Sequence, residues 1–400
     1  MNIKIIANFP ANLDGKSYGR FLQIGEMLCE QGHDVELITS TFEHGKKAHT
    51  RKVTGNFRTK ITLLDEPGYP NNVSLKRLYS HYVWGKNVNK YIKQQQQKID
   101  IIYLAVPSLT AGVQMAKYCR NSGVKLVIDV QDLWPEAFCL VIKNKILQLG
   151  FKPMEWYVNR VYRSADKVIA VSETYTQRAL SVNKKDSTGL SIFLGNDGEL
   201  FDKSREQFAV KYDNNAIRLA YIGTLGYSYD IPCILRALKI VIERNGELKD
   251  KLRFVIMGDG PLRSHFETQA NELKVNHAVE FTGQLSYPEM VGRMCSCDIV
   301  VNPIMKNAAQ SITNKVGDYA LSGLPVINTQ DCQEYRDMIT KYSCGINCEN
   351  GDEYSVADAI ERLCADKNLR KEYGMNHRTL GVERFDRRNT YQEIINYILN

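Results

Sequence analysis

The stretch that decides the fold reads Cys297-Asp-Ile-Val-Val-Asn-Pro303, then Asn314-Lys-Val-Gly-Asp-Tyr319, then Ser322-Gly-Leu-Pro-Val-Ile327. An apolar strand over 299–301 ends at the Asn-Pro pair, and a short helix follows it. A glycine and a proline end that helix before a second apolar strand over 326–327. The order strand–helix–strand is typical of an α/β domain with a parallel sheet.

The short helix carries a cation and a carboxylate, Lys315 and Asp318, three residues apart. Side chains at this spacing share one helix face. The helix begins beyond the carboxyl end of a strand, where open α/β sheets bind ligands. We therefore predict that Lys315 faces the phosphates of a nucleotide diphosphate and that Asp318 accepts hydrogen bonds from ribose hydroxyls. Taken alone, a surface ion pair on an amphipathic helix is the more common arrangement, because such pairs are frequent and weak.

Length and composition indicate a globular α/β protein of two domains. The chain has 400 residues, too many for one small core, with 44% apolar and 24% charged residues. Its longest apolar runs are far shorter than the ~20 residues that span a bilayer. We expect Met1 to Pro10 to form a first buried strand rather than a signal peptide, because Lys4 interrupts a short apolar run.

The cysteines and the net charge exclude few classes of protein. The ten cysteines form no Cys-x-x-Cys pair and have no histidine at zinc spacing, which predicts free thiols in the cytoplasm. The net charge is +7, and no nucleic-acid-binding module accompanies it. Much of the charge is local, which indicates either a solvated loop or attraction to an anionic membrane surface. The residues of this basic cluster are Lys46, Lys47, His49, Arg51, Lys52, Arg58 and Lys60.

Apolar runs predict two series of strands with a crossing between them. We place the linker near residues 190–215, the first domain at 1–193 and the second at 194–384. An amphipathic C-terminal helix within 385–400 is expected to pack back on the first domain through Tyr391, Ile394, Ile395 and Ile398. The predicted strands are 3–7, 35–39, 99–104, 125–129 and 167–171, then 218–222, 253–257, 279–281, 299–301 and 326–327.

Two glycine-containing loops follow predicted strands and open helices. One contains Gly15 and Gly19, and the other contains Gly258 and Gly260. Glycines let backbone N–H groups approach an anion, and a helix N-terminus adds favourable partial charge. One such loop is weak evidence, because many simply turn the chain, but two would give each domain a loop that faces an anion.

Several motifs together resemble the retaining glycosyltransferases of family 4. Those enzymes have the GT-B architecture, an α/β fold of two Rossmann-like parallel-sheet domains that face each other across a cleft. The resemblance implies sugar transfer from a nucleotide diphosphate, expected to be UDP, with retained anomeric configuration, no cofactor and no essential metal. The motifs that carry it are 31–39 and 165–172 in the first half, Gly195-Asn-Asp197 with Phe201 at the crossing, and 256–263, 281–285, 297–303 and 318–327 in the second half.

Matched positions imply roles for individual residues. Asp318 is similar to the family's ribose-binding glutamate, Lys315 would contact the diphosphate, and residues 283–285 would flank the base. The remaining residues predicted to bind the nucleotide sugar are Gly223, Thr224, Leu285, Gln310 and Asn314. Thr224 stands where many members have a phosphate-binding arginine, Gln310 replaces the first glutamate of a paired motif, and Leu194 replaces the usual asparagine at the crossing.

A narrower resemblance lies in Asp132-Leu-Trp-Pro-Glu136, which is similar to a signature of bacterial capsule and O-antigen transferases. It implies a role in lipopolysaccharide or capsule synthesis, with N-acetyl-L-fucosamine as one candidate sugar. Asp132 is either a catalytic residue that orients acceptor or sugar, or a helix N-cap. Ala105 lies where many members have a histidine for the sugar's 6-hydroxyl, so we expect a 6-deoxy donor.

Two segments mix cations with aromatic residues, 75–84 and 145–163. If the acceptor is a polyprenyl-diphosphate-linked sugar, one of them should contact the inner face of the cell membrane. The alternative for the first segment is a helix that packs Leu78, Tyr82 and Trp84 against the sheet.

Two other functions remain open from the sequence. A nucleotide-sugar 2-epimerase of the same fold needs an acid/base pair for elimination, and no convincing pair can be assigned. A nucleotide-sugar-binding subunit without catalytic activity would explain the substitutions at Leu194, Thr224 and Gln310.

Overall fold

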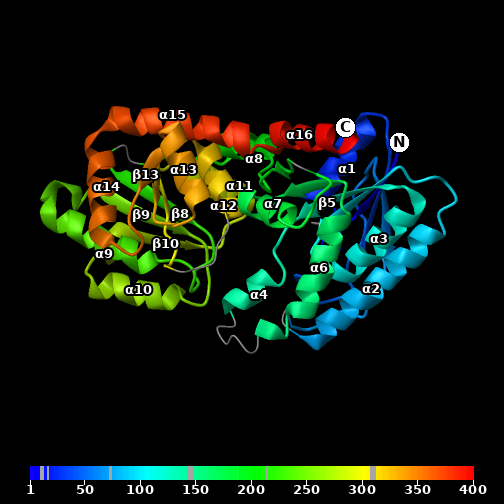
Figure 1. Ribbon diagram of the computed structural model, residues 1–400. Helices are drawn as coiled ribbons and strands as arrows, with labels where there is room; N and C mark the ends of the chain where they lie inside the picture. The colour runs from blue at the N-terminus through cyan, green and yellow to red at the C-terminus, as the bar shows by residue number, and fades with distance from the viewer. Residues whose placement is uncertain are drawn as a thin grey trace. The chain divides into compact units, whose positions relative to one another are not determined.

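The computed structural model describes residues 1–9, 13–15, 18–71, 74–141, 148–186, 188–212, 215–306 and 312–400. The chain divides into two compact units, which are described separately below (Figure 1). Unit 1 comprises Met1–Phe193 with Tyr391–Asn400, and unit 2 comprises Leu194–Thr390. Each is a Rossmann-like parallel sheet flanked by helices, which confirms the predicted fold class.

Unit 1 contains a seven-stranded sheet in the order β3-β2-β1-β4-β5-β6-β7, in which every pairing is parallel. The strands are β1 (Asn2–Ile6), β2 (Asp34–Ser40), β3 (Lys60–Leu64), β4 (Ile101–Val106), β5 (Lys125–Val130), β6 (Lys167–Ala170) and β7 (Leu190–Ser191). The helices are α1 (Arg20–Glu30), α2 (Leu75–Lys93), α3 (Leu109–Ser122), α4 (Glu136–Val141), α6 (Lys152–Ser164), α7 (Glu173–Leu180) and the C-terminal α16 (Arg387–Leu399).

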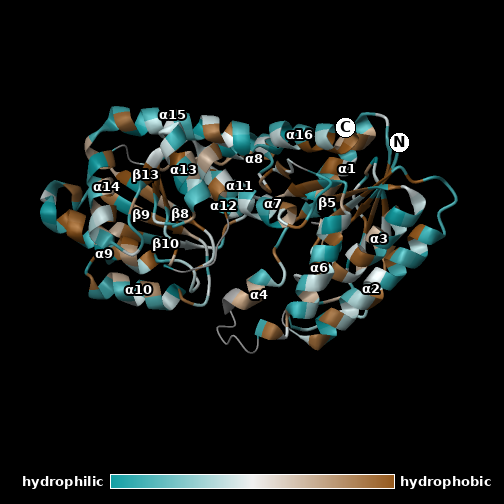
Figure 2. Cartoon of the chain, viewed as in Figure 1, coloured by the Kyte–Doolittle hydropathy of each residue, from teal (hydrophilic) through white to brown (hydrophobic). Residues whose placement is uncertain are grey.

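Successive residues of the central strands point to opposite faces of this sheet and build two cores. On one face Ile102 and Leu104 pack with residues of α2, α3 and α6. On the other face Ile101 and Tyr103 pack with α1 and with the apolar side of α16. The helices therefore show both hydrophobic and hydrophilic residues along their length (Figure 2). The predicted amphipathic C-terminal helix is confirmed, since Tyr391, Ile394, Ile395 and Ile398 are all fully buried.

Unit 2 contains a six-stranded parallel sheet in the order β10-β9-β8-β11-β12-β13. One face packs on α9, α10 and α14, and α12 lies beside α15 (Figure 1). The strands are β8 (Ile217–Ile222), β9 (Leu252–Met257), β10 (Val279–Gly283), β11 (Ile299–Asn302), β12 (Val326–Asn328) and β13 (Gly345–Asn347). The helices are α8 (Gly198–Gln207), α9 (Ile231–Arg244), α10 (Arg263–Glu272), α11 (Tyr287–Cys295), α12 (Asn314–Ser322), α13 (Gln333–Tyr342), α14 (Glu353–Ala365) and α15 (Lys367–Arg384).

The chain passes from unit 1 to unit 2 after Phe193, inside the region 190–215 where the linker is predicted, but this region is not an extended linker. This region contains β7, which pairs with β6, and the ten-residue helix α8. The side chain of Asp197 caps α8 by accepting hydrogen bonds from the backbone N–H groups of Glu199 and Leu200. The helix has few apolar residues, so its sequence lacks the periodicity that would reveal it.

The prediction that 75–84 packs Leu78, Tyr82 and Trp84 against the sheet is correct only for the indole. Trp84 is fully buried in the core beneath α2. Four large side chains of the same helix are 44 to 83% exposed: Leu75, Leu78, Tyr79 and Tyr82. They follow one another at helical spacing on the outer face, where no described residue of unit 1 covers them.

Six of the seven residues of the basic cluster lie in the loop between β2 and β3, and none of these six side chains is buried. Lys60 belongs to β3 and lies 3.2 Å from Glu36, and Arg58 pairs with Glu30 of α1. Lys46 pairs with Glu43 at 2.7 Å. Much of the positive charge is therefore offset by nearby carboxylates.

Candidate functional site

Glycines bring the loops after β8, β9 and β10 into backbone contact. Gly223 has a φ of 131° and Gly258 a φ of 155°, and both values are unfavourable for residues with a side chain. A Cβ atom on Gly258 would lie only 1.9 Å from the carbonyl oxygen of Gly223. The backbone N–H of Leu225 donates to the carbonyl of Asp259 at 2.9 Å and ties two of the loops together. The two glycine segments therefore meet each other at the carboxyl edge of the sheet.

A pocket of about 450 Å³ opens at this edge, where parallel sheets of this type bind ligands. Its walls come from the loops after β8, β9 and β10 and from helices α11 and α12. The lining residues are Ile222, Gly223, Thr224, Met257, Gly258, Asp259, Gln284, Leu285, Tyr287, Met290, Lys315 and Asp318.

Lys315 lies buried on the first turn of α12 inside a cage of tyrosine rings. Its Nζ is 3.6 Å from the ring centre of Tyr229 and 4.5 Å from that of Tyr221, and it donates to the Tyr221 hydroxyl at 3.3 Å. No described carboxylate forms an ion pair with it. Burying an unpaired ammonium costs several kcal/mol, whereas each cation–π contact returns only ~0.5–2 kcal/mol. Burial accordingly moves the pKa of Lys315 well below its ordinary value.

Asp318 lies one turn later on α12 and is held by two neighbours. Its Oδ1 accepts hydrogen bonds from Asn196 Nδ2 at 2.7 Å and from the Tyr287 hydroxyl at 2.9 Å. Burial raises the pKa of Asp318 to about 7, although both hydrogen bonds favour the ionised form. Among the described residues none donates to Oδ2, so this oxygen is available to a ligand in the pocket.

Six of the residues predicted to bind the nucleotide sugar line this single pocket: Gly223, Thr224, Gly258, Leu285, Lys315 and Asp318. Gly260 and Asn314 do not line it. Gly260 packs against the backbone of Leu225, and Asn314 is the exposed first residue of α12. Gln310 lies outside the described residues. The roles of all these residues toward a ligand stay predictions.

Gly15 and Gly19 belong to unit 1 and are not part of this pocket. Gly15 has a φ of 78° and approaches the backbone of Gly55, which is a structural reason for a glycine there. Gly19 is the N-cap of α1. The next residue, Arg20, forms a buried ion pair with Asp129 at 2.7 Å and donates to the carbonyl oxygens of Ile192 and Phe193.

The interpretation of Asp132 as a helix N-cap is wrong, because α4 begins only at Glu136. Asp132 instead organises its own loop in unit 1. One carboxylate oxygen accepts from the backbone N–H of Leu133 at 2.9 Å and the other from Trp134 Nε1 at 3.1 Å. Burial raises the pKa of Asp132. The Trp134 ring in turn lies 4.7 Å below the Arg77 guanidinium.

Sequence reasoning missed four residues that surround the pair on α12: Asn196, Tyr221, Tyr229 and Tyr287. Tyr221 lies on β8 and Tyr287 begins α11, so their distance from Lys315 and Asp318 along the chain gives no signal of contact. Asn196 belongs to the crossing motif that sequence analysis did identify, but nothing in that motif indicates that its side chain reaches Asp318.

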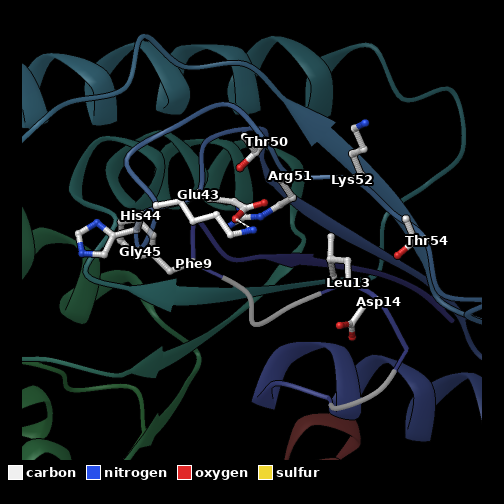
Figure 3. A pocket seen from close by; sticks show the side chains of 11 residues that line it. Phe9, Leu13, Asp14, Glu43, His44, Gly45, Thr50, Arg51, Lys52 and Thr54 are labelled. Carbon is white, nitrogen blue, oxygen red and sulfur yellow. Dashed lines mark ion pairs between the residues drawn. The ribbon is translucent and has the colours of Figure 1, made fainter. Parts of the chain in front are cut away.

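A second pocket, of about 590 Å³, lies in unit 1 beside the segments that follow β1 and β2. Phe9 forms part of its wall, with Glu43 near the middle of the group, His44 on one side, and Lys52 and Thr54 on the other (Figure 3). Arg51 reaches inward and donates to the carbonyl oxygen of Ser40 at 2.6 Å. The remaining lining residues are Leu13, Asp14, Gly45, Lys46 and Thr50. An aromatic ring among carboxylates, cations and hydroxyls suits a polar ligand with a ring face.

The described residues contain neither a metal-binding cluster nor a helix that could cross a membrane. No three His, Cys, Asp or Glu side chains gather at a place that could hold a metal ion. In the same ranges, no helix combines the length and the apolar character that a membrane crossing requires.

Two family models match this chain. Residues 20–185 match the model described as Glycosyltransferase Family 4, and residues 216–366 match the model described as Glycosyl transferases group 1. The chain is also 22% identical over 236 residues to an uncharacterized glycosyltransferase of Methanocaldococcus jannaschii. That match covers 58% of this chain and 58% of the relative, so it spans less than two thirds of the relative's length.

Solved structures of similar fold cover the whole chain. HepE of Anabaena in complex with UDP superposes with a TM-score of 0.67 at 17% identity over 100% of both chains. WaaG, a glycosyltransferase involved in lipopolysaccharide biosynthesis, gives 0.63 at 14% identity over 99% of both chains. Identities this low show the fold alone. The family matches lie one in each unit, and the chain is therefore built from two glycosyltransferase domains with the GT-B fold.

Proposed function

We propose that this protein is a retaining glycosyltransferase that moves a sugar from a UDP-activated donor to a lipid-linked glycan acceptor. The observation that carries the proposal is the unit 2 pocket, where Lys315 and Asp318 lie together beside the glycine loops. A bound diphosphate would give the Lys315 amine the anionic partner that no described residue provides. Ribose hydroxyls can donate hydrogen bonds to Oδ2 of Asp318. The complex of HepE with UDP supports uridine as the base.

Transfer with retention proceeds in this proposal by departure of the diphosphate and attack by the acceptor on the same face of the sugar. The acceptor hydroxyl gives its proton to the leaving phosphate oxygen. Negative charge builds on the diphosphate, and Lys315 and nearby backbone N–H groups stabilise it. Such groups act strongly because they are fixed before the reaction in a pocket with little water.

The test is turnover by the purified protein with a panel of nucleotide sugars, preceded by a thermal-shift screen, since a bound ligand stabilises the folded state. We expect UDP release that depends on acceptor. Lys315→Ala should lower kcat by about 10²–10³-fold, because one such electrostatic group contributes ~3–4 kcal/mol to the transition state. An unchanged kcat would refute the role of Lys315. Conversion of the donor into its 2-epimer would favour an epimerase, and UDP binding without turnover would favour a binding subunit.

For the sugar we propose a 6-deoxy N-acetylamino sugar such as N-acetylfucosamine, which makes the enzyme an acetylaminosugar transferase. The support is Ala105 on β4, where the resemblance places a histidine that contacts a 6-hydroxyl. An apolar wall leaves a 6-hydroxyl without a partner, which costs about 1–3 kcal/mol. We therefore expect kcat/KM to favour the 6-deoxy donor at least about tenfold over its 6-hydroxylated counterpart. A preference in the other direction would contradict the assignment.

The acceptor we propose is a polyprenyl-diphosphate-linked sugar of capsule or O-antigen synthesis. Three observations support it: the Asp132-Leu-Trp-Pro-Glu136 signature, the polar pocket of unit 1 with its Phe9 ring, and the exposed apolar face of α2. In this proposal the protein works in the cytoplasm at the surface of the membrane that holds the acceptor. The outer side of α6 offers a second apolar surface, with Trp156 and Tyr157 about half exposed.

A further inference from the structure

The surroundings of Lys315 are unusual because they contain aromatic rings but no counterion. The Tyr221 hydroxyl accepts from Lys315 and donates to the carbonyl oxygen of Thr224 at 2.9 Å, so it is a neutral phenol. Tyr229 presents the face of its ring to Nζ, and a Cβ atom on Gly223 would lie 3.1 Å from Nζ. The segment 307–311, which leads into α12, contains no Asp or Glu in its sequence. No described carboxylate therefore lies within ion-pair distance of this amine.

The two carboxylates that line the same pocket, Asp318 and Asp259, form no ion pair with Lys315. Asp318 Oδ1 accepts hydrogen bonds from Asn196 and Tyr287, and Asp259 lies 3.9 Å from Arg263. Burial raises the pKa of Tyr221, Tyr287 and Tyr319, so these phenols stay neutral near pH 7. A buried amine among neutral groups is most stable without its proton.

We propose that nucleotide binding in this pocket is coupled to the uptake of one proton by Lys315, and that Tyr221 and Tyr229 are the positioning residues that hold the amine ready for it. The inference rests on the proposed function and adds a proton to the binding step. The proton comes from the buffer acid and forms an N–H bond with the lone pair of Nζ. The ammonium group so formed pairs with a pyrophosphate oxygen.

The coupling has a thermodynamic consequence that binding experiments can detect. When a ligand binds only the protonated form, its affinity falls about tenfold per pH unit above the pKa of the free amine. The rings of Tyr221 and Tyr229 then determine the pKa of Lys315 in the free protein, and this pKa sets how many protons are taken up on binding. If water replaced a ring, it would solvate the ammonium group, and more of Lys315 would be protonated before binding. Fewer protons would then be taken up when the ligand binds.

Isothermal titration of the full-length protein with UDP measures the uptake. The titration is repeated at pH 8 in buffers that differ in ionisation enthalpy, because the slope of the observed enthalpy gives the protons exchanged. At pH 8 Asp318, with its pKa of about 7, is already mostly ionised and contributes little. We expect an uptake of about 0.5–1 proton per UDP for the wild type.

Three variants test the assignment, and one of them, Tyr229→Phe, is the matched control. Lys315→Met keeps the length of the side chain without the amine, and it should bind UDP more weakly, with no proton uptake and with an affinity independent of pH between 7 and 9. Tyr229→Phe keeps the ring face and should behave as the wild type. Tyr229→Leu removes the ring and should lower the uptake at least about twofold. Melting temperatures show whether each variant is folded.

The outcomes separate this inference from the proposed function. UDP binding to the wild type with the same enthalpy in every buffer would overturn the proton coupling and leave the proposed function standing. Uptake that persists in Lys315→Met would overturn the assignment to this residue. Equal uptake in Tyr229→Leu and Tyr229→Phe would overturn the positioning role of the ring. No binding of any nucleotide to the wild type would overturn both proposals.

Discussion

Glu36 is buried in β2, yet it is ionised. Lys4 of the adjacent β1 donates to it at 2.8 Å, and the hydroxyls of Thr62 and Tyr91 donate to its other oxygen. Burial by itself raises the pKa of Glu36, but these hydrogen bonds outweigh burial and bring it to about 2. Because the folded-state pKa lies below the unfolded value of about 4.3, the carboxylate stabilises unit 1 above that pH, and this contribution is lost as the pH falls toward 2.

Lys4→Met should destabilise the protein by at most about 3 kcal/mol at pH 7, because it removes the buried cation from Glu36 and leaves only the largely exposed Lys60, 3.2 Å away. The difference in the free energy of unfolding between the variant and the wild type should shrink between pH 5 and pH 3, because protonation of Glu36 then removes its negative charge. Urea denaturation at pH 7, 5 and 3 measures both effects. The double variant Lys4→Met/Glu36→Gln is the matched control, and it should lose little stability at any of these pH values. A constant difference across the range would contradict the account.

Residue spacing within one element could predict part of the site. Lys315 and Asp318 are three residues apart on one helix, and the structure does bring both into one pocket. The tyrosine cage and the Asn196 contact could not be predicted. They join residues that are 86 to 122 positions apart, such as Tyr229 with Lys315 and Asn196 with Asp318. Contacts of this kind depend on how whole helices and strands pack together. They leave no regular residue spacing that could be recognised in a single sequence.

At the scale of elements, the central strands could be predicted and three edge strands could not. The apolar runs at 218–222 and 253–257 correspond to β8 and β9, which are covered on both faces. The missed strands, β3, β7 and β13, each lie at the edge of a sheet. None of their residues is fully buried, and two of the three strands have only two or three residues. Such strands leave no continuous apolar run.

Helix α2 has a structural face and an exposed face, and they should respond differently to substitution. Trp84→Ala on the buried face should cost about 3–5 kcal/mol, because it leaves a large cavity in the core. A quadruple serine variant at Leu75, Leu78, Tyr79 and Tyr82 should change stability by less than about 0.5 kcal/mol per site. Thermal and urea denaturation measure this contrast.

The quadruple variant also tests the proposed membrane surface. We expect the wild type to float with vesicles that contain anionic lipid and the variant to stay in the soluble fraction, because apolar burial and attraction of cations such as Lys76 and Lys86 act together. A triple variant with serine at Trp156, Tyr157 and Leu149 tests the surface near α6 in the same way. A wild type that binds no vesicles would count against the lipid-linked acceptor.

At the scale of the whole molecule, the chain passes between the two units twice, after Phe193 and after Thr390. Within unit 2 the two segments beside these passages are tied together. The backbone N–H of Asn196 donates to the carbonyl of Phe385 at 2.7 Å, and that of Arg387 donates back to Asn196 at 3.1 Å. The Asn196 side chain also holds Asp318 in the pocket. The last ten residues then complete the core of unit 1, so the folding of unit 1 requires both ends of the chain.

A chain that ends at Thr390 should therefore lose unit 1 and keep unit 2. Four fully buried side chains of α16 would be absent, Tyr391, Ile394, Ile395 and Ile398. At ~1.5–3 kcal/mol each they contribute about 6–12 kcal/mol, which is comparable to the whole stability of a domain. UDP titration should still report binding to the shortened chain, whereas near-UV dichroism should lose the signal of the buried Trp84. Glu393→Ser/Asn396→Ser on the exposed side of α16 is the control and should leave both measurements unchanged. Loss of UDP binding on truncation would show instead that the nucleotide pocket of unit 2 depends on a folded unit 1.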